Sequence, residues 1–188
     1  RLGSDGALSV TGDVVLGANV TVVSGGGVTF NNDINADNAT NNDRTLSLSS
    51  GQSSTITVTG NVGTSQALAG LTILQSNQTT FSANVDVSDS NSGTITLTDT
   101  SNDKHIRFEG NLTADNLTTA VQGYRLFLIG DTTTFTNAVS FQNADNVALG
   151  NEAGDSLTFN GGLTTTGVSG GGTVFINGTI QTSNDAIV

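Results

Sequence analysis

The chain has 188 residues and a formal net charge of −11, with 16 acidic residues against five Lys and Arg. Five dispersed cations cannot neutralise a phosphate backbone, so composition argues against nucleic-acid binding. The sequence has no Cys, Met, Trp or Pro, which excludes disulfides, thiolate metal sites and a catalytic cysteine. Abundant Gly, Asn, Thr, Ser and Asp distinguish it from an average globular core.

A short phrase recurs seven times: an apolar or Thr residue, a spacer, Val or Phe, a spacer, two small residues and a branched apolar residue. The period runs from 20 residues (8 to 28) to 28 residues (28 to 56), and an eighth copy begins at Ile180. Such self-similarity is typical of solenoids, in which each unit buries its apolar face only by stacking on its neighbours. The phrases begin at Leu8, Val28, Ile56, Thr79, Ile106, Thr133 and Leu157.

Each unit predicts three short strands. Alternation within the phrase, as in Ile56-Thr57-Val58, indicates a strand, and the two small residues indicate a bend with the positive φ that Gly and Asn adopt at least cost. A further apolar couplet supplies the third strand. In chain order, the expected bends and couplets are Gly12-Asp13 with Val20 and Val22; Asn32-Asp33 with Leu46 and Leu48; Gly60-Asn61 with Leu71 and Ile73; Ala83-Asn84 with Ile95 and Leu97; Gly110-Asn111 with Leu126 and Leu128; Asn137-Ala138 with Val147 and Leu149; and Gly161-Gly162 with Val174 and Ile176.

These elements predict an all-β, right-handed parallel β-helix of about seven rungs, each of 20 to 28 residues with three short strands. Residues 1–188 are expected to form one solenoid segment, an excerpt of a longer repeat array. Linkers that are long at Asn35–Thr45 and Thr113–Arg125, but short at Gly17–Asn19, predict surface insertions at one corner. Stacking is expected to align two interior files: Val10, Phe30, Val58, Phe81, Phe108, Phe135 and Phe159; and Val14, Ile34, Val62, Val85, Leu112, Val139 and Leu163.

Catalytic chemistry has few candidates. His105 is the only histidine, and its charged neighbours favour a solvated strand position over a hydrolase triad. Polysaccharide-cleaving β-helices use paired carboxylates in a groove. Asp is also a typical turn residue, and these Asp residues fall at or beside predicted corners, so the structural interpretation is favoured, and no catalytic, cofactor-binding or metal-binding residue is assigned. The candidate pairs are Asp86 with Asp89, Asp99 with Asp103, and Asp13 with Asp33.

Other ligands leave weaker signals. The Gly-rich runs Ser24–Gly27 and Ser169–Gly172 lack the Asp of calcium-binding β-rolls, so only incidental calcium at Asp-rich turns is expected. Thr-rich stretches at Thr132–Thr134 and Thr164–Thr166 suggest an ice-binding array, although β propensity also favours Thr on exposed strands. The outward file for that array is Ser9, Thr29, Thr57, Thr80, Arg107, Thr134 and Thr158, and Asn-x-Ser/Thr sequons occur at Asn19, Asn38, Asn77, Asn111, Asn116 and Asn177.

The phrases Val28–Ile34 and Leu157–Gly167, with Gly and Asn corners and few cations, resemble the repeat regions of filamentous-haemagglutinin-type adhesins and autotransporter passenger domains. The resemblance covers Ala7 to Val188 without a signature motif, so no site residue is carried over. It implies a secreted β-helix stalk at a bacterial cell surface. Its partner would be an unknown receptor or glycan of a host, matrix or other cell.

We therefore expect a non-enzymatic structural or adhesive rod of an extracellular fibre, in which copies can stack end to end into filaments. The sequence has no run of 18 apolar residues and no charged-then-apolar leader, so neither membrane insertion nor a signal peptide is expected in this segment. The alternatives are a carbohydrate-active or carbohydrate-binding β-helix, for which one Tyr and no Trp offer few aromatic platforms, and an ice-binding solenoid.

Overall fold

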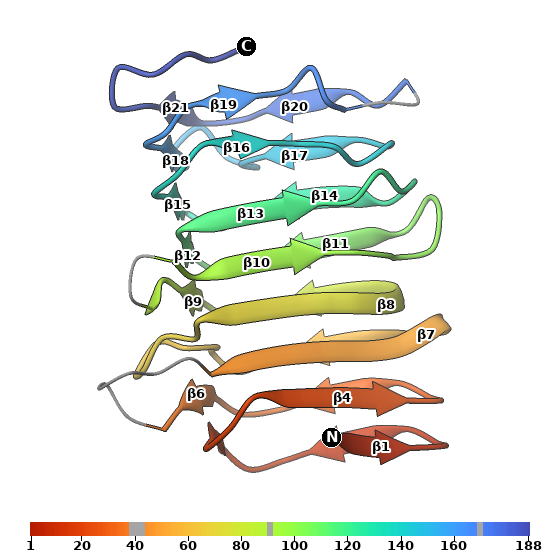
Figure 1. Ribbon diagram of the computed structural model, residues 1–188. Coiled ribbons are helices and arrows are strands. Elements are labelled where there is room, and N and C mark those ends of the chain that lie inside the picture. Colours follow the sequence, from red (N-terminus) through yellow and green to blue (C-terminus); the bar gives the residue numbers. More distant parts are fainter. Residues whose placement is uncertain (38–43, 90–91, 169–170) are drawn as a thin grey trace.

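The computed structural model describes residues 1–37, 44–89, 92–168 and 171–188. The chain winds into a parallel β-solenoid of about seven turns, with its two ends at opposite ends of the rod (Figure 1). Successive strands visit three faces in rotation, and neighbouring turns pair through parallel ladders on each face. The predicted fold class is therefore confirmed.

The three faces are numbered in the order in which the chain reaches them. The first face contains β1 (Leu2–Ser4), β4 (Val20–Ser24), the first halves of β7 (Thr45–Val58) and β8 (Gly70–Phe81), β10 (Thr94–Leu97), β13 (Asn116–Thr119), β16 (Val139–Ser140) and β19 (Leu163–Thr164). The second contains β2 (Leu8–Val10), β5 (Val28–Phe30), the second halves of β7 and β8, β11 (His105–Phe108), β14 (Arg125–Leu128), β17 (Val147–Leu149) and β20 (Val174–Ile176). The third contains β3 (Val14–Leu16), β6 (Ile34–Ala36), a bridge at Val62, β9 (Val85–Val87), β12 (Leu112–Ala114), β15 (Thr132–Phe135), β18 (Ser156–Phe159) and β21 (Thr179–Gln181).

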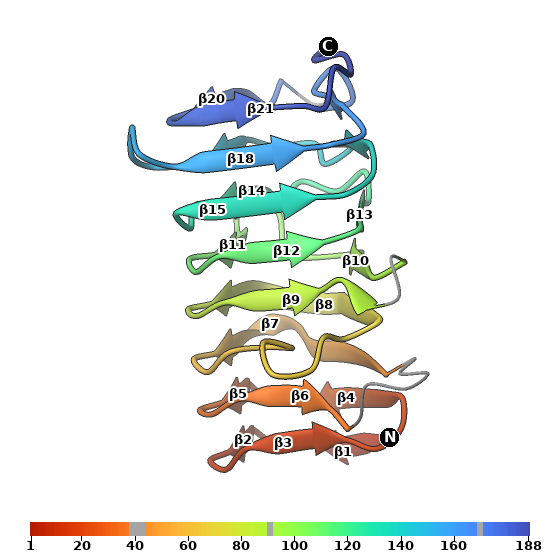
Figure 2. The same ribbon diagram turned by 90° about the vertical axis from the view of Figure 1, so that its left-hand side faces the viewer.

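The coil is right-handed. In Figure 1 the front strands β4, β10 and β13 run left to right, the strands behind them run back to the left, and the chain rises from N to C. Figure 2 shows the third face, where β12, β15 and β18 carry the chain from the back of the first view to its front. This sense agrees with the strong preference for right-handed crossovers between parallel strands.

One continuous apolar core fills the coil from the first turns to the last. Inward residues alternate with outward residues along most strands, so β11 buries Ile106 and Phe108 while His105 and Arg107 point outward. Aromatic residues stack within this core: the rings of Phe81 and Phe108 lie 4.9 Å apart at their centroids, and those of Phe135 and Phe159 lie 5.7 Å apart.

The prediction that five Phe residues share one interior file is wrong. Phe30 and Phe81, with Val58 between them, and Phe108 follow one another on the second face, but the next turn places Leu128 against Phe108. Phe135 instead pairs with Ala114 and Phe159 on the third face. The interior therefore has two separate aromatic stacks.

A missed strand causes this shift. The expected insertion Thr113–Arg125 contains β13, whose single buried apolar residue, Leu117, completes the first face of its turn. Every later sequence unit is consequently displaced by one face. The second predicted file is also wrong beyond Leu112, because the observed file continues as Thr133, Leu157 and Ile180. Val139 and Leu163 lie on the first face instead. The last three predicted couplets, which begin at Leu126, Val147 and Val174, lie on the second face.

Corner geometry also differs from expectation. Among the residues of the seven predicted bends, all of which the structure describes, Gly162 alone has a positive φ, of 96°. Glycine at these corners is explained by close contact between turns. A Cβ on Gly60 would lie 2.2 Å from the carbonyl carbon of Asn32, and one on Gly110 would lie 2.4 Å from that of Ala83.

Asn and Asp at the corner between the second and third faces form a polar ladder. Each side-chain oxygen accepts a hydrogen bond from a backbone N–H of the following turn. The ladder therefore pairs corner N–H groups that face the preceding turn, and it links five turns along the rod. Its bonds run from Asn61 N to Asp33 Oδ1 (2.8 Å), Asn84 N to Asn61 Oδ1 (3.2 Å), Asn111 N to Asn84 Oδ1 (2.9 Å) and Thr132 N to Asn111 Oδ1 (3.0 Å).

Candidate functional site

The corner between the first and second faces is the most polar part of the interior. Ser76 Oγ lies 2.9 Å from both Thr79 Oγ1 and Thr100 Oγ1, and all three side chains are buried. In later turns Tyr124 and Asn143 occupy buried positions near the same corner. This column of hydroxyl and amide groups was not visible in the sequence, because its members become neighbours only through the register of the turns.

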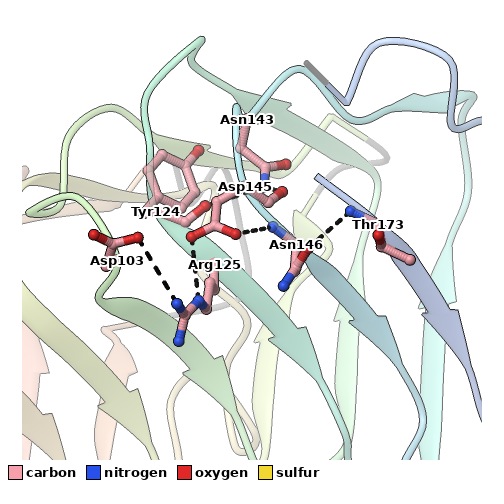
Figure 3. Close-up of polar contacts among 7 residues, drawn as sticks. All are labelled: Asp103, Tyr124, Arg125, Asn143, Asp145, Asn146 and Thr173. Atoms are coloured by element: carbon pink, nitrogen blue, oxygen red, sulfur yellow. Dashed lines mark hydrogen bonds and ion pairs between the residues drawn. The ribbon is translucent and has the colours of Figure 1, made fainter. Parts of the chain in front are cut away.

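Charged groups surround the outer side of this corner at β14 and β17 (Figure 3). Arg125 contacts two carboxylates: its Nε lies 3.1 Å from Asp145 Oδ2, and its Nη2 lies 3.8 Å from Asp103 Oδ1. The other oxygen of Asp145 accepts the backbone N–H of Asn146 at 2.7 Å, and Asn146 Oδ1 accepts that of Thr173 at 2.8 Å. These contacts join four consecutive turns, those of β11, β14, β17 and β20.

A shallow polar hollow of about 310 Å³ lies beside these residues. Asp103, whose φ is 60°, and Asp145 bring two carboxylates to it, and Arg125 is shared between them. An acid–base pair needs groups free to exchange protons with a substrate. Here the carboxylate closer to Arg125 is already occupied by two hydrogen bonds. The hollow is lined by Asn102, Asp103, Gly123, Ala144, Asp145, Gly171 and Gly172.

Tyr124 is held inside the coil. Its hydroxyl donates to the Leu97 carbonyl at 3.2 Å, and burial raises the pKa of the phenol well above its ordinary value. Asn143 donates through Nδ2 to the carbonyls of Tyr124 and Asp145, at 3.2 and 2.8 Å. The two side chains therefore hold the corner backbone in place.

His105 points outward from β11. Its ring meets Phe127 edge-on at a centroid distance of 5.8 Å, and burial, followed by the charge of Arg107, lowers its pKa. Within residues 1–37, 44–89, 92–168 and 171–188, no hydroxyl or carboxylate is hydrogen-bonded to this ring. The expected outward strand position is thus observed.

The predicted carboxylate pairs make structural contacts. Asp13 and Asp33 accept bonds from Asn32 and Asn61 at the ladder corner. Asp99 accepts bonds from Gln52 and Gln75, at 2.7 and 3.2 Å, and thereby links three turns.

The remaining candidate carboxylates lie elsewhere. Asp103 faces Arg125, and Asp86 accepts a bond from Ser88 on the third face, while Asp89 contacts other groups. Among the described residues, no group of three or more His, Cys, Asp or Glu side chains is arranged to hold a metal ion. The predicted Gly-rich run Ser169–Gly172 and the sequon at Asn38 lie wholly or partly outside the described residues.

The outward file proposed for an ice-binding array mixes two faces. Ser9, Thr29, Thr57, Thr80 and Arg107 are in register on the second face, whereas Thr134 and Thr158 lie on the third. A different hydroxyl file is continuous over five turns of the first face: Thr21, Ser47, Thr72, Thr96 and Thr118.

Sequence reasoning also missed an aromatic file. Phe127 and Phe175 follow Arg107 outward on the second face, with Ala148 between them. Their outward direction depends on the register that follows β13, so the repeat alone did not reveal it.

Comparison with protein-family models, curated proteins and solved structures found no match. In the part of the chain that the structure describes, no helix has the length and apolar character needed to cross a membrane.

Proposed function

We propose that this chain is a non-enzymatic, rod-forming segment of an extracellular bacterial surface fibre. The observation that supports it most directly is the continuity of the structure along one axis. One core runs through the whole rod, the ladder of the second face joins all of its strands, and the polar side chains at the corners also bond from turn to turn. Such an object holds its two ends at a fixed distance, which is the property that a stalk requires.

Surface charge supports the same proposal. Carboxylates gather at the corners, while outward strand positions are mostly Thr, Ser or Asn. A net charge of −11 on a narrow rod keeps neighbouring rods apart and in solution. Because the rods repel one another, adhesion to another surface would depend on local contacts made by individual exposed side chains.

The location of the chain on the cells that produce it tests the proposal. Antibodies raised against the folded chain, with immunogold electron microscopy of intact cells, should label the outer surface or filaments that extend from it. Antibody adsorbed with purified chain is the control. Label confined to the cell interior would contradict the proposal.

End-to-end stacking is a further part of the proposal. The edge of β1, β2 and β3 surrounds an apolar hollow of about 230 Å³, and Ile176 and Ile187 are exposed at the other end. Another turn, from the same polypeptide or from a second copy, would cover such surfaces. Light scattering over a concentration series should show mass increasing with concentration, and a constant monomer mass would contradict stacking of copies.

The carbohydrate-active alternative has a direct test. Incubation with polyuronides and neutral glycans, followed by measurement of new reducing ends, should show no release if the rod is non-enzymatic. Release that disappears in an Asp145→Asn or Asp103→Asn variant would instead establish an enzyme.

A further inference from the structure

Two of the eight Phe residues differ from the others in their orientation. Six are buried, with exposed fractions of 3% or less, whereas Phe127 is half-buried on the outer surface and Phe175 is 50% exposed. Both lie in one outward file of the second face, where Arg107 pairs with Phe127, Phe127 with Ala148, and Ala148 with Phe175.

The two outward rings are spaced along the rod so that one extended ligand could contact both. Neighbouring parallel strands are ~4.8 Å apart, so the two rings lie roughly 10 Å apart along the rod axis. The small side chain of Ala148 leaves space between them. Arg107 begins the file one strand before Phe127, with its guanidinium carbon 5.7 Å from the ring centroid.

Polar groups border this file. His105 meets the edge of the Phe127 ring. Two residues before Phe127, Ala148 and Phe175 in the chain, the polar residues Arg125, Asn146 and Thr173 occupy the same side of the three turns (Figure 3). The apolar strip is therefore one residue wide. A stable protein partner typically buries about 800 Å² on each side, which two rings and one methyl group cannot supply.

The charges around the strip favour a neutral ligand over a charged one. Lys104, Arg107 and Arg125 are balanced by Asp103, Glu109 and Asp145, and each Arg is paired with at least one of these acids. The surrounding rod, at −11 overall, repels polyanions. A neutral chain of rings, with apolar faces for Phe and hydroxyl edges for Arg and His, matches both the width and the charge of the strip.

We infer that the outward file Arg107–Phe127–Ala148–Phe175, here called the aromatic strip, binds a neutral polysaccharide lying along the rod. The sugar rings stack on Phe127 and Phe175, and Arg107 and His105 bond to hydroxyl groups. This binding site is additional to the proposed stalk function and does not depend on it.

Affinity electrophoresis tests this inference with three neutral polysaccharides, hydroxyethyl cellulose, xyloglucan and galactomannan, and with polygalacturonate as the anionic probe. The intact chain should be retarded by at least one neutral polysaccharide, to a similar extent at low and high salt. The Phe127→Ala/Phe175→Ala variant should bind on the order of thirtyfold more weakly, because the two stacked rings together contribute roughly 2 kcal/mol. Val121→Ala is the matched control, since Val121 is 64% exposed and lies between β13 and β14, outside the outward file.

The possible results separate the alternatives. Circular dichroism establishes that the variants are folded, and both changed Phe residues are outward. No retardation by any neutral polysaccharide would overturn the inference, as would equal retardation of the intact chain and the double variant. Salt-sensitive binding to polygalacturonate alone would also overturn it. Loss of self-association in the double variant, without glycan binding, would assign the strip to a second copy of the chain instead.

Discussion

The rings of Phe81 and Phe108 are parallel to within 4° and lie 4.9 Å apart in consecutive turns of the second face. Their separation matches the distance between neighbouring parallel strands, so the two rings stack without a change in backbone geometry. Phe135 and Phe159 repeat the arrangement on the third face. Aromatic stacking thus stabilises the solenoid in two separate places.

Phe108→Ala should destabilise the rod by about 3–5 kcal/mol, because a buried ring is replaced by a cavity. Phe108→Asp should unfold the middle of the rod, since a charge would be buried without a partner. Chemical denaturation measures both effects. Phe175→Ala is the control, and its outward side chain should make it nearly neutral; equal losses at positions 108 and 175 would show that Phe108 is not interior.

Gly60→Ala should cost about 1–3 kcal/mol, because its new Cβ would overlap the backbone of Asn32 in the preceding turn. Gly12→Ala is a matched control at the same corner of the first complete turn, where a Cβ meets no atom within 4 Å. Thermal melting of the two variants compares them directly. Similar melting temperatures would contradict the role of close contact between turns.

Asn84→Ala should cost about 1 kcal/mol, since the Asn111 N–H loses its acceptor in the ladder. Asn84→Asp retains an acceptor oxygen and should lose less. Hydrogen exchange at the Asn111 amide provides a local measurement. Unchanged protection of that amide in Asn84→Ala would contradict the ladder.

Tyr124 should make stability depend on alkaline pH. Burial raises the pKa of its phenol in the folded state above the ordinary value of about 10, so its contribution is complete below that pH and is lost as pH rises toward the folded-state pKa. Denaturation between pH 9 and 11 should therefore show a steeper loss for the native chain than for Tyr124→Phe. Parallel pH curves would show that the phenol does not contribute.

The repeat in the sequence was sufficient to predict the coil, its three strands per turn and its period, because alternating apolar residues and small corner residues mark each strand and bend. It was not sufficient to assign strands to faces. All three corners use the same residue types, and β13 has only one core residue, Leu117, so its turn was read as an insertion.

Polar contacts were still harder to predict. Ser76 and Thr100 are 24 residues apart in the chain, and their contact can be predicted only when the register of the turns is known. Corner Asn residues were expected to adopt positive φ angles. Instead, their side-chain oxygens accept hydrogen bonds from backbone N–H groups of the following turn. The outward orientation of Phe127 and Phe175 likewise follows from the register after β13.

After β13, each strand lies on a different face from the one that a simple sequence repeat would give it, and cross-linking tests this arrangement. The chain has no Cys, so paired Cys substitutions report contacts without background. Thr113→Cys with Thr134→Cys places two thiols on neighbouring strands of the third face, ~4.8 Å apart at the backbone and within disulfide range. Arg107→Cys with Thr134→Cys pairs the positions that the sequence repeat alone would align.

Mild oxidation, followed by non-reducing electrophoresis and peptide mapping, is the measurement. We expect rapid intramolecular disulfide formation for the pair at positions 113 and 134 and none for the pair at 107 and 134. Rapid closure of the second pair, with the first remaining reduced, would contradict the arrangement of faces described for this solenoid.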